Sequence, residues 1–212
     1  MEFQLFLKNI NKIQQEKLLG EISHLKMCPP ARADLIENIN LDAVKPREAA
    51  VMMLIYPKNN ITHLALILRT SYNGVHSSQV AFPGGKVENF DENYKQTALR
   101  ETHEEIGIHP DKINVVRDFT PIYIQPSNFM VYPFLGYSDT DLTFIPDHNE
   151  VAGIIEFPLS EFLADNTIVI TNMLTSYSKN VNVPTFKIQE HYIWGATAMI
   201  MSELKDVLKN IF

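Results

Sequence analysis

The chain has 212 residues, of which 45% are hydrophobic and 20% charged, as in an ordinary globular protein. No window repeats, which excludes collagen-like and solenoid architectures. The net charge of −7 provides no broad basic field, so we expect no nucleic-acid partner. No apolar run reaches the ~18–20 residues that span a bilayer, so we expect no membrane partner. A single cysteine, Cys28, excludes an internal disulfide, and the start of the chain lacks a secretion signal. Both features favour a cytoplasmic location.

The first 46 residues are predicted to form an N-terminal helical extension and linker. Apolar side chains recur at intervals of three and four through residues 1–28, which predicts a helical region there. Pro29 and Pro30 end it, because proline cannot continue a helix. We interpret the polar stretch 32–46 as a linker or lid. Residues 1–46 therefore precede a single domain that we expect to occupy residues 47–212.

From residue 47 onward, strand patterns are interleaved with helical ones. The apolar runs 49–56 and 64–69 flank a turn signal, which predicts an antiparallel hairpin of buried strands. A helix is predicted over 91–107, with Asp91 as its N-cap and Gly107 as its C-terminal stop. Layers of helix around a mixed sheet, an α/β (α+β) fold, follow from this order. The remaining predictions are strands at 113–117, 120–124, 130–137 and 151–157, loop and edge strand over 166–192, and a final helix over 199–211.

Three glutamates share one face of the predicted helix 91–107. Glu101, Glu104 and Glu105 stand at i, i+3 and i+4, so their Cβ atoms lie only ~5–6 Å apart and their charges repel. A hard divalent cation such as Mg²⁺ or Mn²⁺ would neutralise them, because these ions prefer carboxylate oxygens. Arg100 can bridge to a carboxylate, and Gly85 lets the backbone approach an ion or a phosphate closely. A solvated acidic helix face is the other interpretation of this spacing alone.

The segment that carries these glutamates has a recognisable signature. Residues 82–85 have the sequence FPGG, and residues 100–108 have the sequence RETHEEIGI. Together they resemble the box of the Nudix hydrolases, Gly-x5-Glu-x7-Arg-Glu-U-x-Glu-Glu-x-Gly-U, in which U is apolar. Glu92 keeps the spacing to Arg100 but lies one residue further from Gly85 than the box has it, and Thr102 stands at an apolar position. The positions that match are Gly85, Arg100, Glu101, Glu104, Glu105, Gly107 and Ile108.

This resemblance implies a fold and an activity. The fold would be a Nudix-type α/β/α sandwich with a mixed sheet and the Nudix loop-helix-loop. Residues 47–212 would then be the Nudix hydrolase domain. The activity would be metal-dependent hydrolysis of the pyrophosphate bond of a nucleoside diphosphate derivative, a small-molecule substrate. Family analogy also implies a homodimer.

The resemblance further implies a role for individual residues. Glu101 and Glu105 would be the first ligands of Mg²⁺ or Mn²⁺, with Gly85 beside the ion and Glu104 as a further ligand or the base. Arg100 would orient the glutamates. Either Glu104 or Glu150 would take the proton of the attacking water.

A narrower resemblance, to the coenzyme A pyrophosphatase branch of the family, extends over about residues 47–205. The branch's upstream signature keeps its spacing here, and Arg69 agrees with it, but Gly74 replaces an arginine and Ser78 a glycine. Segments 127–136, 149–159 and 193–198 are similar to later parts of the branch. The implied reaction splits coenzyme A or acyl-CoA into 4'-phosphopantetheine and adenosine 3',5'-bisphosphate.

Two other functions stay open. The arginine missing at Gly74 favours ADP-ribose or another dinucleotide or sugar nucleotide, because glycine cannot grip a phosphate. Arg69, His76 or Lys86 would then supply the positive charge that binds substrate. A non-catalytic Nudix-fold ligand-binding module is the third interpretation, although the glutamate set is complete.

Overall fold

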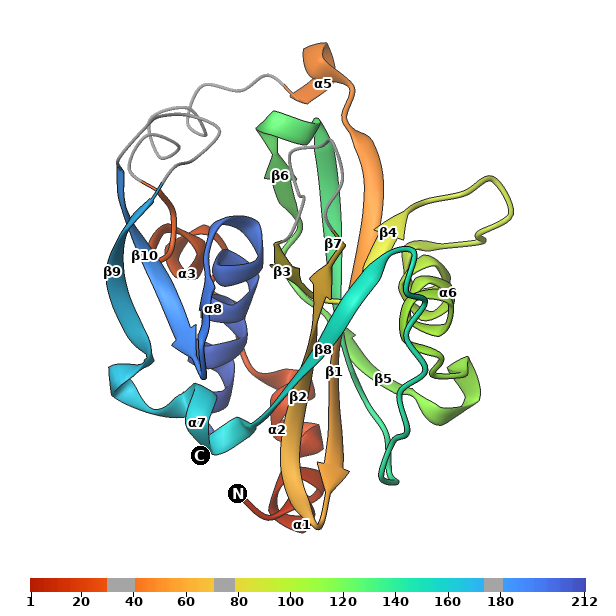
Figure 1. Cartoon of the computed structure of the whole chain (residues 1–212), viewed down its shortest axis with the longest axis vertical. Helices are drawn as coiled ribbons and strands as arrows, with labels where there is room; N and C mark the ends of the chain where they lie inside the picture. Colours follow the sequence, from red (N-terminus) through yellow and green to blue (C-terminus); the bar gives the residue numbers. More distant parts are fainter. Residues whose placement is uncertain (30–40, 71–78, 174–180) are drawn as a thin grey trace.

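A mixed sheet forms the centre of the structure, a computed structural model that describes residues 1–29, 41–70, 79–173 and 181–212. Within these residues its strands are β1 (Arg47–Lys58), β2 (Ile61–Arg69), β3 (Val80–Ala81), β4 (Gly84–Lys86), β5 (Asn114–Asp118), β6 (Ile122–Ile124), β7 (Phe129–Tyr137) and β8 (Val151–Pro158). The main path is β3-β2-β1-β7-β5, while β4 pairs with β1, β6 with β7 and β8 with β2 (Figure 1). β1 and β7 run parallel. The other pairs, including the predicted β1–β2 hairpin, run antiparallel.

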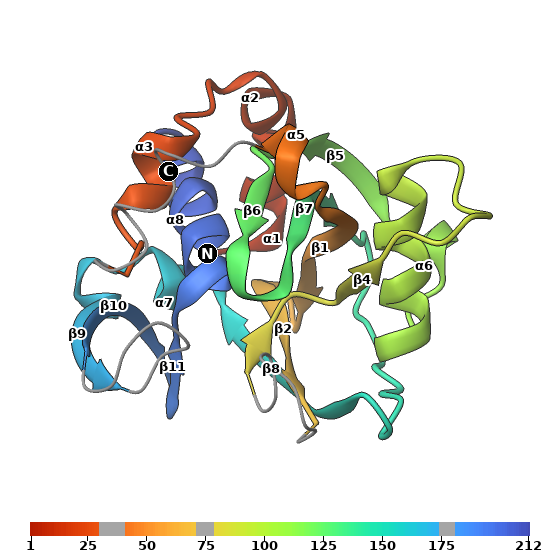
Figure 2. The same cartoon turned by 90° about the horizontal axis from the view of Figure 1, so that it is seen from above.

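Helices cover both faces of this sheet (Figures 1 and 2). α6 (Tyr94–Ile106) packs on one face, where Met52 and Leu54 of β1 belong to the smaller of two core clusters. α8 (Gly195–Lys209) lies on the other face, where Met53 and Ile55 of β1 belong to the larger cluster. Successive side chains of a strand point to opposite faces, so β1 is buried on both sides. The fold is the predicted α/β/α sandwich with a mixed sheet.

The N-terminal segment forms three short helices where the sequence predicts one helical region. They are α1 (Phe3–Lys8), α2 (Ile10–Gln15) and α3 (Glu21–Leu25). Gly20 has a φ of 58°, which interrupts helical geometry before α3. Phe6 and Ile13 are fully buried in the larger core cluster, so the segment shares the core of the domain. The predicted boundary between residues 46 and 47 stays a prediction.

Other helix ends also differ from expectation. α6 begins after Asn93, whose side chain accepts a hydrogen bond from the backbone N–H of Gln96 at 3.0 Å. The predicted N-cap, Asp91, is wrong because Arg100 binds its carboxylate instead. Gly107 ends α6 as predicted, in the left-handed conformation. The linker prediction includes α5 (Leu41–Val44), and residues 30–40 lie outside the described residues. None of the helices in the described part of the chain has the length and apolar character that a membrane span needs.

A second, antiparallel sheet flanks α8, where the sequence predicts loop and edge strand over 166–192. It consists of β9 (Ile168–Met173), β10 (Val181–Ile188) and β11 (His191–Ile193) in the order β11-β10-β9. Along β10 the buried residues Val183 and Thr185 lie on one face and the buried residues Phe186 and Ile188 on the other, whereas Asn182 and Lys187 are exposed. α7 (Leu159–Leu163) connects β8 to this region (Figure 1). The short 3₁₀ turns are η1 (Pro110–Lys112), η2 (Gln125–Ser127) and η3 (Asp165–Thr167).

A buried carboxylate, that of Glu203, ties three segments together. Its oxygens accept hydrogen bonds from the N–H of Gly20 at 2.7 Å, the N–H of Thr120 at 3.0 Å and the hydroxyl of Thr120 at 2.7 Å. Nε2 of His24 lies 3.7 Å from Oε2. Burial by itself raises the pKa of Glu203, but the hydrogen bonds outweigh burial and hold the pKa below its usual value. Glu203 thereby fixes α8 to the N-terminal segment and to the turn before β6.

We expect Glu203→Gln to lower the free energy of unfolding by about 2 kcal/mol or more at neutral pH, because an amide nitrogen would face a buried donor. The carboxylate has a lowered pKa in the folded state. Its contribution is therefore present above about pH 4.3 and lost as pH falls through the folded-state value. Urea unfolding at several pH values should show the gap between wild type and variant closing on acidification. The exposed Glu190→Gln is the matched control, and equal stability of the Glu203 variant and wild type at pH 7 would contradict the account.

Candidate active site

Arg100 on α6 joins four acidic or backbone oxygen partners at the edge of β4. Its Nε and Nη2 donate to the two carboxylate oxygens of Asp91 at 3.0 and 2.8 Å. Nη1 donates to Glu101 at 2.6 Å and to Glu104 at 2.9 Å, and Nη2 also donates to the carbonyl of Lys86 at 3.0 Å. The bond from Arg100 lowers the pKa of Asp91 to about 2, against the opposing effect of burial. Arg100 therefore fixes α6, the loop before it and β4 relative to one another.

Glu101 lies directly against the backbone of Gly85. A Cβ on Gly85 would be 2.3 Å from Oε2 of Glu101, far inside van der Waals contact. Because glycine has no Cβ, the Glu101 carboxylate can occupy this position. Burial raises the pKa of Glu101, the Arg100 guanidinium opposes that rise, and the charges of Glu104 and Glu150 add to it.

Glu105, one turn further along α6, is almost completely buried, with 2% of its side chain exposed. Oε1 accepts a hydrogen bond from Nη1 of Arg69 at 3.0 Å, and Oε2 accepts one from the N–H of Gly84 at 2.8 Å. Burial raises the pKa of Glu105 to about 7. Arg69 and the Gly84 N–H oppose this rise, whereas the charges of Glu101 and Glu150 increase it. Glu105 thus links α6 to the ends of β2 and β4.

The loop before β8 brings Glu150 to the same place. The N–H of Asp147 donates to the carbonyl of Glu105 at 3.0 Å, and the N–H of Thr70 donates to the carbonyl of Glu150 at 2.9 Å. Oε2 of Glu150 lies 3.9 Å from Nη2 of Arg69, and more than half of its side chain is exposed. Carboxylates from α6 and from this loop therefore converge on Arg69.

The other predicted site residues lie further out or outside the described residues. Glu104 is more than half exposed and its described partner is Arg100. Lys86 is also more than half exposed, with Nζ 3.4 Å from Glu88. His76, together with Gly74 and Ser78, lies outside the described residues. Asp91 is the partner that sequence reasoning missed, because an aspartate just before a helix has the usual position of an N-cap.

The donor set suits a hard divalent cation. In the described part of the chain, no three acidic, histidine or cysteine side chains lie together as a ready metal site. Arg69 and Arg100 donate to oxygens of Glu105, Glu101 and Glu104. Each carboxylate nevertheless has unused acceptor positions, because its two oxygens together offer about four lone pairs. The charges of Glu101, Glu105 and Glu150 repel one another. A cation among them would relieve that repulsion, and oxygen donors are those that Mg²⁺ and Mn²⁺ prefer.

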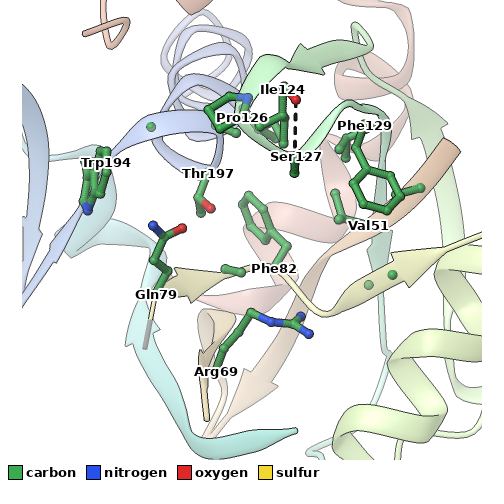
Figure 3. Close-up of a pocket in the computed structure, with 18 of the residues that line it drawn as sticks. Val51, Arg69, Gln79, Phe82, Ile124, Pro126, Ser127, Phe129, Trp194 and Thr197 are labelled. Atoms are coloured by element: carbon green, nitrogen blue, oxygen red, sulfur yellow. Dashed lines mark hydrogen bonds between the residues drawn. The ribbon is translucent and has the colours of Figure 1, made fainter. Parts of the chain in front are cut away.

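A cavity of about 300 Å³ opens beside this cluster, on the α8 face of the main sheet (Figure 3). Arg69, Gly85 and Lys86 contribute to its lining and connect it with the carboxylates. Figure 3 shows Phe82, Thr197 and Phe129 around one common space, although they come from distant parts of the chain. Local sequence patterns do not predict this pocket, because aromatic residues such as Phe129 and Trp194 are also typical of a protein core. The apolar lining includes Val51, Phe82, Ile124, Phe129, Trp194 and Ile200.

Comparison with known proteins identifies the family of the chain. The model of the NUDIX domain matches residues 45–175. The chain belongs to the Nudix hydrolase family. An Enterobacter sp. (strain 638) protein named "Uncharacterized Nudix hydrolase NudL" is 32% identical over 164 residues, which cover 77% of this chain and 83% of that protein. A protein of the same name from Yersinia pestis (strain Pestoides F) is 29% identical over 185 residues, covering 86% of this chain and 90% of that protein.

Solved structures agree with the fold of this Nudix pyrophosphohydrolase. A crystal structure of RenU, a Nudix hydrolase from M. smegmatis, covers 79% of this chain and 88% of its own, with a TM-score of 0.55 and 15% identity. A MutT/nudix family protein from Enterococcus faecalis covers 96% of this chain and 74% of its own, with a TM-score of 0.52 and 14% identity. At these identities the likeness concerns the fold alone. The predicted loop-helix-loop is the segment from β4 through α6 to Gly107.

We expect Gly85→Ala to leave the fold intact and to lower hydrolytic turnover about 100-fold or more. The added methyl group meets the end of the Glu101 side chain, which can swing away without disturbing the backbone but then leaves its position. Circular dichroism melting and turnover should be measured together. Gly153→Ala is the matched control, because a Cβ there meets nothing within 4 Å. Turnover within twofold of wild type in the Gly85 variant would contradict this role for the Gly85–Glu101 contact.

Proposed function

We propose that this enzyme hydrolyses the pyrophosphate bond of coenzyme A or an acyl-CoA with the help of Mg²⁺ or Mn²⁺. The products would be 4'-phosphopantetheine and adenosine 3',5'-bisphosphate. The observation that carries the proposal is the position of Glu101 beside Gly85 and of Glu105 beside Gly84, within the electrostatic influence of Glu150, next to a largely apolar cavity that both glycines line. The carboxylates would bind a cation and a water molecule, and the cavity would bind part of a large substrate.

Glu101 and Glu105 would hold the ion, with Glu104 and the backbone of Gly85 as further contacts. The ion, when bound, polarises phosphoryl oxygens and lowers the pKa of the attacking water. Arg100 keeps Glu101 and Glu104 in place through its own anchoring to Asp91. Such charge-assisted hydrogen bonds contribute about 1.5–3 kcal/mol each, more than the few tenths of a kcal/mol by which neighbouring like charges destabilise a helix.

The proton of the attacking water would go to Glu104 or Glu150. Both side chains are more than half exposed, so water reaches either of them, and both influence the protonation of Glu101. Arg69 and Lys86 at the edge of the cavity would bind phosphate oxygens. A role for His76 in binding substrate is proposed from the sequence alone.

Coenzyme A is favoured as substrate by the resemblance that extends over residues 47–205, well beyond the Nudix box. Gly74 and Ser78 are the residues that favour ADP-ribose or another dinucleotide instead. The complete Glu101, Glu104 and Glu105 set argues against a module that only binds its ligand.

A substrate panel with Mg²⁺ and with Mn²⁺ tests this function. Coenzyme A, acetyl-CoA, ADP-ribose, NADH and a diadenosine polyphosphate should be compared, with the products identified by mass. We expect the highest kcat/KM for coenzyme A or acetyl-CoA, with release of 4'-phosphopantetheine or its acyl form. A higher kcat/KM for ADP-ribose would contradict the substrate, and no turnover with any compound in the presence of metal would contradict the reaction.

A further inference from the structure

Charge and apolar surface occupy different parts of the cavity lining. The charged residues that line it, within the described part of the chain, are Arg69 and Lys86. Arg69 is bonded to Glu105, so it marks the catalytic edge, and Lys86 follows Gly85 on β4. Away from that edge the cavity is enclosed by Ile124 and Phe129 on one side and by the start of α8 on the other (Figure 3). A polyanion would therefore find positively charged partners at the catalytic edge and none deeper in the cavity, among the described residues.

The hydroxyl groups in the deeper part already have backbone partners. Thr197 donates to the carbonyl of Val80 at 3.1 Å, and Ser127 donates to the carbonyl of Ile124 at 3.5 Å. A sugar with several hydroxyl groups needs a partner for each of them when it is buried. In a mainly aliphatic chain the polar groups are separated by apolar stretches, which need no partners and gain from contact with Phe82, Phe129 and Trp194.

The two sides of the deep part, one at β6 and one at α8, are also held in place. Arg47 donates to the carbonyl of Ser127 at 2.8 Å, and its guanidinium lies 4.2 Å from the centre of the Phe129 ring. Glu203 binds Thr120, two residues before β6, and belongs to α8 itself. Both sides of the deep part are thus anchored through interactions that do not involve the catalytic carboxylates, which is typical of a preformed binding pocket.

We infer that the deep part of the cavity, between Phe129 and the first turns of α8, binds the neutral arm of the substrate, and that Ala196 and Trp194 determine which arm fits. This inference rests on the proposed function for the identity of the arm. In coenzyme A that arm is the pantetheine chain, which carries two amides, a hydroxyl and a thiol between aliphatic stretches, and no charge. The adenosine 3',5'-bisphosphate half then lies outside the deep part, since its phosphates need the cations of the catalytic edge or solvent.

Trp194 provides a direct probe, because it is the single tryptophan of the chain and lines the cavity. Its fluorescence should be followed in metal-free protein during separate titrations with pantetheine, adenosine 3',5'-bisphosphate and ribose 5-phosphate. We expect a saturable change with pantetheine and none with the other two compounds. A saturable change with adenosine 3',5'-bisphosphate alone would show that the deep part binds the nucleotide instead, and would overturn the inference. So would the absence of any change with pantetheine.

A substitution at Ala196 connects this pocket to turnover. Ala196→Leu fills space in the cavity lining, and Ala152→Leu, at an exposed position of β8 away from the cavity, is the matched control. We expect Ala196→Leu to raise both the pantetheine dissociation constant and the KM for coenzyme A at least tenfold, with kcat within about threefold of wild type. Thermal melting checks that both variants fold. Unchanged KM and pantetheine binding in Ala196→Leu would contradict the inference.

The two proposals fail in different ways. Saturable pantetheine binding that Ala196→Leu weakens, in an enzyme that does not hydrolyse coenzyme A, would contradict the proposed reaction and support the pocket assignment. Hydrolysis of coenzyme A without any response of Trp194 to pantetheine would support the reaction and contradict the pocket assignment.

Discussion

The arrangement of the site depends on one guanidinium, that of Arg100, shared among several carboxylates. Three glutamates within five residues of α6 would otherwise repel one another. Arg100 takes two of them, Glu101 and Glu104, while Asp91 holds it from the other side with both oxygens. The third, Glu105, is compensated independently by Arg69. The charge is thus balanced locally without being removed, and acceptor positions stay available for an ion.

Close backbone approach is the second constraint at this edge. Gly84 has a φ of 152°, and a Cβ there would be 2.3 Å from the carbonyl oxygen of Ala50. Gly85 leaves room for the Glu101 carboxylate in the same way. The two glycines let β4 pair with β1 while α6 packs close to it. The carboxylates of α6 therefore lie against two glycines that themselves line the pocket on the opposite face of the sheet.

Local sequence signals predicted much of this structure, and their failures have physical causes. The hairpin of β1 and β2, the strands from β5 to β8 and the end of α6 at Gly107 follow from apolar runs and a glycine stop. The second sheet was predicted only as loop and edge strand, because exposed polar residues such as Asn182 and Lys187 interrupt the apolar pattern of β10. Asp91 was misassigned because its partner, Arg100, lies nine residues away. The pocket could not be predicted, since it is lined by Val51, Phe129 and Trp194, which only the fold brings around one cavity.

The central claim is that Glu101 and Glu105 form a divalent cation site, and Mn²⁺ binding measured by electron paramagnetic resonance tests it without reference to any substrate. Wild-type protein, Glu105→Gln and the exposed control Glu92→Gln should be titrated under the same conditions. The account predicts saturable Mn²⁺ binding in wild type and control, and a dissociation constant at least tenfold higher in Glu105→Gln. Equal Mn²⁺ affinity in a folded Glu105→Gln variant and in wild type would contradict it.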